Sequence, residues 1–175
     1  MIKSDFTDIG GLKMTKDEKK VLNTLTNLGI HYKRIEHPPV FTVEEANRLC
    51  NIEKTGCKNL FLKERKHENY YLLIMLDYKR ADFKEVSKQL NLSRLSFANE
   101  EELYFLLGLN SGEVTPFGLL NDTDKIVNVI LDNELENCKY VSFHPNTNTS
   151  TLVLRYKDFE RYLEWSNNTV EKVLI

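Results

Sequence analysis

The first candidate for chemistry is the pair Lys58-Asn59, which opens an apolar run that continues to Leu62. Such a run predicts a strand with the polar pair at its entry. A lysine there could hold a phosphate as a compact charge or donate to a carbonyl oxygen. Taken alone, the simpler interpretation is an exposed lysine at the start of a strand, because lysines are mostly exposed.

A second candidate is the turn-rich segment 110–118, in which Gly112 and Gly118 enclose Pro116. Glycines let a backbone approach a ligand closely and point its N–H groups inward. Amide donors fixed in this way suit an ester carbonyl or a developing oxyanion. An ordinary connecting loop would have the same composition, so this pattern is weak evidence by itself.

His144 is the third candidate, since it follows an expected strand and precedes a polar loop that runs to Thr149. Functional groups are common on loops that a rigid scaffold positions. A histidine there could donate a hydrogen bond, orient a substrate or carry a proton near neutral pH. The alternative is a histidine whose ring is simply satisfied by backbone groups.

Other signatures of chemistry are missing from the sequence. It has no Walker loop, no HExxH zinc motif, no GxSxG nucleophile elbow and no dinucleotide-binding glycine pattern. The three cysteines, Cys50, Cys57 and Cys138, are widely spaced and form no CxxC pair. This spacing argues against a zinc site or a disulfide framework and favours a reducing compartment. We therefore expect no metal, no cofactor and a cytoplasmic location.

Charge is divided unevenly along the chain, although the net value is only −2. Residues 1–88 carry 17 Lys and Arg against 13 Asp and Glu, whereas residues 89–175 carry 7 against 13. The N-terminal half could therefore present a phosphate-binding face, although a solvated basic surface explains the same bias. The longest apolar run, at 70–76, is too short to span a bilayer, so no membrane partner is expected.

The expected elements indicate one α/β domain with a mixed, largely antiparallel sheet flanked by helices. A capping box at 15–18 begins a helix that stops at Gly29, and a second box at 42–45 begins a short helix through Leu49. Further helices are expected at 81–90, 100–107 and 158–165, and strands at 30–36, 59–65, 70–76, 95–98, 126–131, 140–143, 150–155 and from 169 onward. Residues 1–13 are interpreted as a leader, disordered or foreign to the native protein, and residues 14–175 as the domain.

Taken together and in this order, these segments resemble the YbaK/prolyl-tRNA-synthetase-associated editing domain family. Each motif is modest alone, but four in register between Met14 and Leu163 are hard to obtain by chance. The free-standing alanyl-tRNA(Pro) deacylases are the most similar group within the family. The four motifs are His37-Pro-Pro-Val-Phe41-Thr42, Lys58-Asn59-Leu-Phe-Leu62, Gly112-x-x-x-Pro116 and Ser142-Phe-His144-Pro-Asn146.

The resemblance implies an enzyme that hydrolyses the ester between a wrong amino acid and the terminal adenosine of a tRNA, without a metal. It implies catalytic roles for Lys58 and Gly112, and an acceptor-stem contact for the expected helix at 42–49. Aminoacyl-tRNA(Pro) is the implied partner, together with prolyl-tRNA synthetase. The substrate-binding residues that the resemblance implies are Asn59, Pro116, His144, Phe41 and Thr42.

A site shaped for proline cannot strongly reject the smaller alanine, because each missing methylene is worth only about 1–3 kcal/mol. A second, smaller pocket can admit alanine and exclude proline. Two alternatives stay open at this point. One is a deacylase for cysteinyl-tRNA(Pro) or for another small amino acid on tRNA, and the other is a tRNA-binding module of the same fold without catalysis.

Overall fold

The computed structural model describes residues 14–39 and 56–175. The expected leader at 1–13, the expected helix at 42–49 and the substrate-binding candidates Phe41 and Thr42 lie outside these residues. Every contact given below joins residues within the two described ranges.

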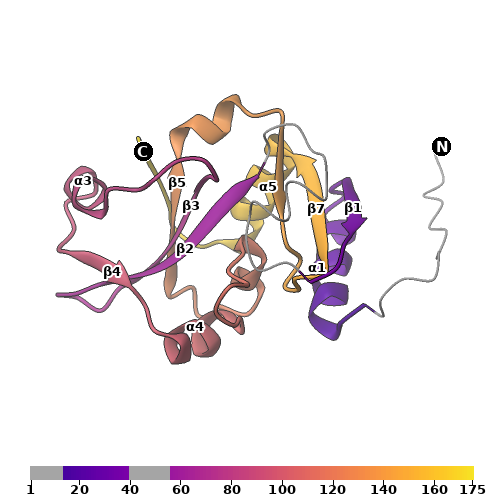
Figure 1. The fold of residues 1–175 in the computed structure, drawn as a ribbon, viewed down its shortest axis with the longest axis horizontal. Helices are drawn as coiled ribbons and strands as arrows, with labels where there is room; N and C mark the ends of the chain where they lie inside the picture. Colours follow the sequence, from indigo (N-terminus) through magenta and orange to yellow (C-terminus); the bar gives the residue numbers. More distant parts are fainter. Residues whose placement is uncertain (1–13, 40–55) are drawn as a thin grey trace.

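The described residues form eight strands in two sheets (Figure 1). The smaller sheet has the order β1–β7–β6, and the larger has the order β4–β2–β3–β5–β8. The strands are β1 (Tyr32–Glu36), β2 (Cys57–Glu64), β3 (Tyr70–Leu76), β4 (Leu95–Phe97), β5 (Val127–Asp132), β6 (Tyr140–Phe143), β7 (Ser150–Arg155) and β8 (Val170–Val173).

Strand pairing confirms the predicted fold class. Four pairs are antiparallel, and only β3–β5 and β5–β8 are parallel. The sequence pattern indicates one sheet, whereas the structure divides the strands between two. The physical reason is that β1 pairs with β7, far along the chain, and not with its sequence neighbour β2.

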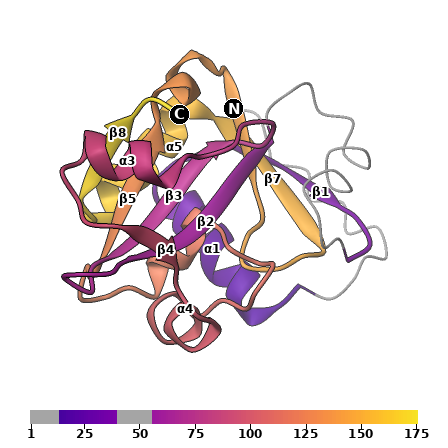
Figure 2. The same cartoon turned by 60° about the vertical axis from the view of Figure 1, so that its left-hand side comes forward.

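Helices cover both faces of the larger sheet. One core lies between that sheet, the smaller sheet and the helices α1 (Lys16–Asn27), α4 (Glu100–Leu107) and α5 (Tyr156–Ser166). A second core lies on the opposite face, where α3 (Phe83–Gln89) packs through Val86 (Figure 2). Strand β3 serves both: its residues 72, 74 and 76 belong to the first core and residues 71, 73 and 75 to the second. A strand buried on both faces explains the continuous apolar run in the sequence.

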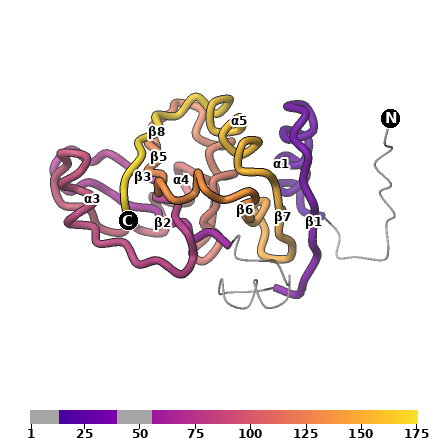
Figure 3. The backbone as a smooth tube through the Cα atoms, turned by 90° about the horizontal axis from the view of Figure 1, so that it is seen from above, coloured from indigo at the N-terminus to yellow at the C-terminus, as the bar shows by residue number. Residues whose placement is uncertain are grey.

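The two sheets are joined by a single backbone bridge among the described residues. Gly56 and Ser142 form this isolated parallel bridge, which sets the start of β2 beside β6. Seen from above, β1, β6 and β7 lie with α1 on one side of the molecule and the larger sheet lies on the other (Figure 3). Two short 3-10 helices, η1 (Pro116–Leu120) and η2 (Asn133–Asn137), flank β5 in the sequence.

The start of α1 differs from the expected capping box. Thr15 accepts from the Glu18 backbone N–H at 3.0 Å, as expected, but the Glu18 carboxylate accepts from Arg34 and Ser150 instead of returning to the cap. Only half of the box therefore forms, because two donors from the smaller sheet compete for this carboxylate. A complete capping box occurs at α4, between Asn99 and Glu102.

Candidate functional site

The predicted site segments meet where the two sheets join. Lys58 lies two residues after the bridging Gly56, and His144 lies two residues after the bridging Ser142. The bridge therefore brings the entry of β2 and the end of β6 to the same place, although more than eighty positions separate them in the sequence. We take this junction as the candidate site.

The loop at 110–118 packs into the same junction and is fixed there by side chains from both sheets. Three hydrogen bonds hold it: Asn59 Nδ2 to the Val114 carbonyl at 3.1 Å, Thr115 Oγ1 to the His144 carbonyl at 2.7 Å, and Asn146 Nδ2 to the Phe117 carbonyl at 3.4 Å. The Tyr162 hydroxyl of α5 adds a bond to the Pro116 carbonyl at 3.0 Å. Thr115 to Leu119 are buried, so this part of the loop is a packed wall and not a solvated connection.

Gly112 lies apart from that wall. It is exposed and has φ +85°, a left-handed conformation that favours glycine. A Cβ added there would meet no atom within 4 Å, so the requirement for glycine comes from backbone conformation and not from crowding. Gly112 thus sets the path of the loop at its exposed rim, while Val114, Thr115 and Phe117 make the contacts with the other segments.

Lys58 is half-buried, and its ammonium donates to the backbone carbonyl of Lys79 at 2.8 Å. Lys79 follows β3, the strand that pairs with β2. A carbonyl oxygen is a neutral acceptor, so the positive charge of Lys58 is not cancelled by this contact. A phosphate or carbonyl oxygen of a ligand could therefore still bind the ammonium.

The Lys79 side chain is held by two ion pairs. Its ammonium contacts the Asp132 carboxylate at 2.8 Å and Glu134 at 3.1 Å, and the Asp132 side chain is fully buried. Burial by itself would lower the pKa of Lys79, but the two ion pairs raise it above the usual value. Because β3 and β5 are parallel neighbours, their carboxyl ends share one sheet edge, and this ion pair fixes the loop that carries the acceptor of Lys58.

His144 is held as a neutral ring. Its Nδ1 lies 2.9 Å from the Ser150 carbonyl, which can only accept, so Nδ1 carries the proton and Nε2 is the acceptor in the neutral form. Burial lowers the pKa of His144; the Ser150 carbonyl opposes this, and nearby His37 lowers it further. A neutral histidine at this position can accept a hydrogen bond from a substrate hydroxyl or amine, or from water.

His37 is a site residue that the sequence interpretation missed. Its ring is 5% exposed and meets the His144 ring edge-on, with centroids 5.7 Å apart. His37 Nε2 lies 2.9 Å from Thr151 Oγ1, which anchors the ring to β7. The only signal in the sequence was the motif that starts at His37, because one histidine before two prolines carries no chemical pattern of its own.

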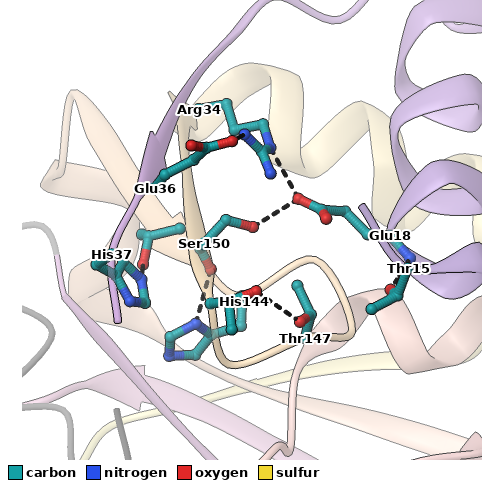
Figure 4. Close-up of polar contacts among 10 residues, drawn as sticks. Thr15, Glu18, Arg34, Glu36, His37, His144, Thr147 and Ser150 are labelled. Atoms are coloured by element: carbon teal, nitrogen blue, oxygen red, sulfur yellow. Dashed lines mark hydrogen bonds and ion pairs between the residues drawn. The ribbon is translucent and has the colours of Figure 1, made fainter. Parts of the chain in front are cut away.

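A buried carboxylate supports the histidine side of the junction. Glu18 is 1% exposed and accepts from Ser150 Oγ at 2.6 Å and from Arg34 Nε at 2.8 Å (Figure 4). The same Ser150 presents its backbone carbonyl to His144. Glu18 therefore ties α1, β1 and β7 together around the residue that sets the His144 tautomer.

Two amide oxygens in the junction have no hydrogen-bond partner among the described residues: Asn59 Oδ1 and Asn146 Oδ1, both buried. An unpaired buried acceptor costs about 1–3 kcal/mol, so such atoms call for an explanation. The side-chain Nδ2 of each asparagine donates to a carbonyl of the loop at 110–118, as given above. Their oxygens remain available to accept N–H or O–H groups of a ligand.

Of the predicted site residues, the structure brings Lys58, Asn59, Pro116 and His144 together and leaves Gly112 at the rim. Phe41 and Thr42 lie outside the described residues. Within the two described ranges, no group of three or more His, Cys, Asp or Glu side chains could hold a metal ion. Cys57 and Cys138 form no disulfide within the described ranges. No helix in the described part of the chain is long and apolar enough to cross a bilayer.

Similarity to known proteins extends over most of the chain. A model of the aminoacyl-tRNA editing domain matches residues 37–162. The prolyl-tRNA editing protein ProX of Acetoanaerobium sticklandii is 37% identical over 163 residues, covering 91% of this chain and 99% of that protein. A prolyl-tRNA synthetase associated domain-containing protein of Danio rerio is 34% identical over 154 residues, covering 86% of this chain and 83% of its own length.

Solved structures share the fold. One assigned provisionally as a trans-editing enzyme for prolyl-tRNA synthetase superposes with a TM-score of 0.74 at 21% identity, covering 93% of this chain and 99% of that one. At that identity the match establishes the fold alone.

Proposed function

The chain belongs to the aminoacyl-tRNA editing domain family, and we propose that it is a trans-editing hydrolase that removes alanine from mischarged tRNA(Pro). Its substrate is the ester between alanine and the ribose of the terminal adenosine. The contacts that draw Lys58, Asn59, the loop at 110–118 and His144 to one junction carry the proposal. The resemblance in sequence also assigns roles to Lys58, Asn59, the Gly112–Pro116 loop and His144.

The reaction asks little of the protein, because an aminoacyl ester is already activated. Water attacks the ester carbonyl carbon, the bond to the ribose oxygen breaks, and that oxygen leaves with a proton. Positioning the water and stabilising the oxyanion can supply the required acceleration. The ribose hydroxyl next to the ester can orient the water, which explains why no catalytic triad is needed.

Each part of the junction has a role in this proposal. Lys58 anchors the terminal phosphate or ribose with its uncancelled charge. Backbone amides of the loop that begins at Gly112 bind the substrate carbonyl. The free amide oxygens of Asn59 and Asn146 accept from the amino group of alanine, and neutral His144 accepts from the ribose or the water. Phe41, Thr42 and Pro116 complete the substrate pocket.

Proline is excluded by size in this proposal. The loop wall from Thr115 to Leu119 is buried, and the side chains of Asn146 and Tyr162 donate to its carbonyls. Thr115 itself donates to the His144 carbonyl, so the wall cannot yield easily to a larger substrate. Residues 42–49 would contact the acceptor stem, and prolyl-tRNA synthetase would supply the mischarged tRNA. The protein would act in the cytoplasm, where tRNA is charged.

The test is hydrolysis of a panel of radiolabelled tRNA(Pro) esters by the purified protein. We expect alanyl-tRNA(Pro) to be deacylated fastest and prolyl-tRNA(Pro) to be spared. A higher rate on cysteinyl-tRNA(Pro) would replace alanine with cysteine as the substrate. Binding of every tRNA without turnover would identify a non-catalytic module instead.

A further inference from the structure

The loop between β3 and α3 lies against the candidate lysine, and the mechanism above uses only its backbone. Lys79 in this loop offers the carbonyl that accepts from Lys58 at 2.8 Å. The residues on either side of Lys79 are Tyr78, which is 67% exposed, and Arg80, which is also exposed. The two sequence neighbours of the residue that Lys58 contacts thus carry an aromatic ring and a guanidinium.

This loop is fixed in place and is not a loose connection. The Lys79 ammonium is bound by buried Asp132 and by Glu134, the Lys79 N–H donates to the Leu76 carbonyl at 3.1 Å, and the Asp77 N–H donates to the Gly56 carbonyl at 3.1 Å. The charge of Lys79 is therefore paired with carboxylates of the protein itself. The exposed side chains next to it are presented from a rigid support, which lowers the entropic cost of binding through them.

We propose that Tyr78 and Arg80 bind the unpaired 3′ end of the tRNA, Tyr78 by stacking on a base and Arg80 by pairing with a phosphate. This inference rests on the proposed function, since it requires the ester at the end of that strand to lie at Lys58. Every base has a π face, so an exposed aromatic ring binds unpaired nucleotides whatever their sequence. A guanidinium matches the geometry of a phosphate and keeps its charge at all relevant pH values.

Surrounding charges favour this loop over the exposed aromatic residues of α4. Tyr104 and Phe105 are 65% and 84% exposed, but they lie on α4, which carries three glutamates in its first turn. A phosphate chain would be repelled there. In the β3–α3 loop, Asp82 uses its carboxylate to cap α3 through the N–H groups of Lys84 and Glu85. Arg80 is exposed and follows Lys79, whose carbonyl accepts from Lys58, so the loop carries positive charge next to the contact of the candidate lysine.

The experiment compares Tyr78→Ala and Arg80→Ala with the wild type on two substrates, alanyl-tRNA(Pro) and 3′-O-alanyl-adenosine. The second substrate has the ester and the terminal nucleoside but no preceding nucleotides. Tyr104→Ala is the matched control, because it removes a tyrosine of nearly equal exposure from another surface.

We expect Tyr78→Ala to lower kcat/KM on alanyl-tRNA(Pro) by about tenfold, the loss typical of one stacked base, and to leave hydrolysis of alanyl-adenosine unchanged. Arg80→Ala should weaken the dependence of log kcat/KM on log salt concentration by about 0.7, the value for one phosphate contact on a single strand. Tyr104→Ala should match the wild type on both substrates.

Two results would overturn the inference. One is wild-type activity of Tyr78→Ala on the tRNA, and the other is an equal loss on both substrates, which would indicate a distorted lysine site. If the wild type hydrolyses neither ester, the proposed function fails, and the dissociation constant for uncharged tRNA(Pro) then becomes the readout. In that case a roughly tenfold weaker affinity of Tyr78→Ala still supports the loop as the binding surface, and an unchanged affinity refutes it.

Discussion

The two sheets contribute unlike halves to the candidate site. The larger sheet supplies Lys58, whose ammonium donates to a neutral carbonyl and whose support is an ion pair between Lys79 and Asp132. The smaller sheet supplies His37, which is buried, and His144, which is half-buried; a hydroxyl and a carbonyl oxygen hold the two rings. One half is therefore built around charge that can reach a ligand, and the other around two imidazole rings, of which His144 has its pKa lowered by burial.

This difference indicates how the two halves of the proposed site would divide ligand binding and discrimination between substrates. A charged ligand group needs a cation near solvent, whereas discrimination between small side chains needs a rigid, dry wall. Placing Lys58 and the two histidines on separate sheets lets each half keep its own dielectric surroundings. The halves should then respond differently to substitution: the larger sheet should lose activity at little cost in stability, and the smaller should lose stability first.

The largest effect should come from Glu18→Ala. This change leaves Ser150 and the partly buried Arg34 without their shared acceptor, and we expect the free energy of unfolding to fall by about 3 kcal/mol. Glu18→Gln keeps an oxygen for Ser150 and should cost only about 1 kcal/mol. Urea unfolding of the two variants measures both values, and equal losses would show that the carboxylate charge, not the acceptor to Ser150, stabilises the fold.

Lys58→Ala should have the opposite signature. We expect kcat/KM on alanyl-tRNA(Pro) to fall about 100-fold, equivalent to about 2.7 kcal/mol of transition-state stabilisation, with a nearly unchanged unfolding midpoint. Among the described residues, the half-buried lysine donates to a backbone carbonyl, which water can serve in its absence. Undiminished hydrolysis by a stably folded variant would remove Lys58 from the mechanism.

A smaller loss should follow from Asp132→Asn. Asparagine keeps an oxygen for the Glu134 N–H but removes the charge that holds Lys79, so the loop under Lys58 should loosen. Deacylation kinetics should show a roughly tenfold lower kcat/KM, of the size seen when a supporting contact of a site is lost. Glu134→Gln is the control: Glu134 is half exposed, and its ion pair is expected to contribute less.

The subtlest effect concerns pH. Since burial lowers the pKa of His144 below 6.5, the ring is neutral at pH 7, and activity should fall only in acid, below that ordinary value. His37→Gln removes a neighbour that lowers this pKa, so the acid limb of the pH–rate profile should move to higher pH. A profile unchanged by His37→Gln would separate His37 from the site.

Stability should follow the same titration. The unfolded chain binds a proton on this histidine at a higher pH than the folded chain does, so folding becomes less favourable as pH falls from 6.5 through the folded pKa of His144. Unfolding midpoints measured across this range for the wild type and for His144→Gln should diverge below pH 6.5. Parallel curves would contradict the depressed pKa.

Local signals in the sequence predicted individual elements well. The helix expected at 100–107 and the strands at 70–76, 140–143 and 150–155 have the predicted bounds, because caps, glycines and apolar runs act within a few residues. The motifs also pointed to segments that lie close together, since three of them meet at the junction of the sheets.

Non-local contacts could not be predicted in this way. The pairing of β1 with β7 divides the strands into two sheets, and no feature of 32–36 specifies so distant a partner. Glu18 shows the same limit: its sequence context predicts a helix cap, while its carboxylate is claimed by residues from β1 and β7. The support of Lys58 by Lys79 and Asp132 is equally invisible, because it depends on the parallel register of β3 and β5.

The spacing of these contacts along the chain also sets the order in which the halves can form. The β2–β3 hairpin that carries Lys58 closes over a short turn, whereas Glu18 and Ser150 are 132 positions apart and His37 and Thr151 are 114 apart. Loop-closure entropy grows with the intervening length, and contacts between distant residues slow folding. We therefore expect the hairpin that carries Lys58 to form early in refolding and the contacts that hold His37 and His144 to form late. Recovery of hydrolysis should then lag behind recovery of the hairpin.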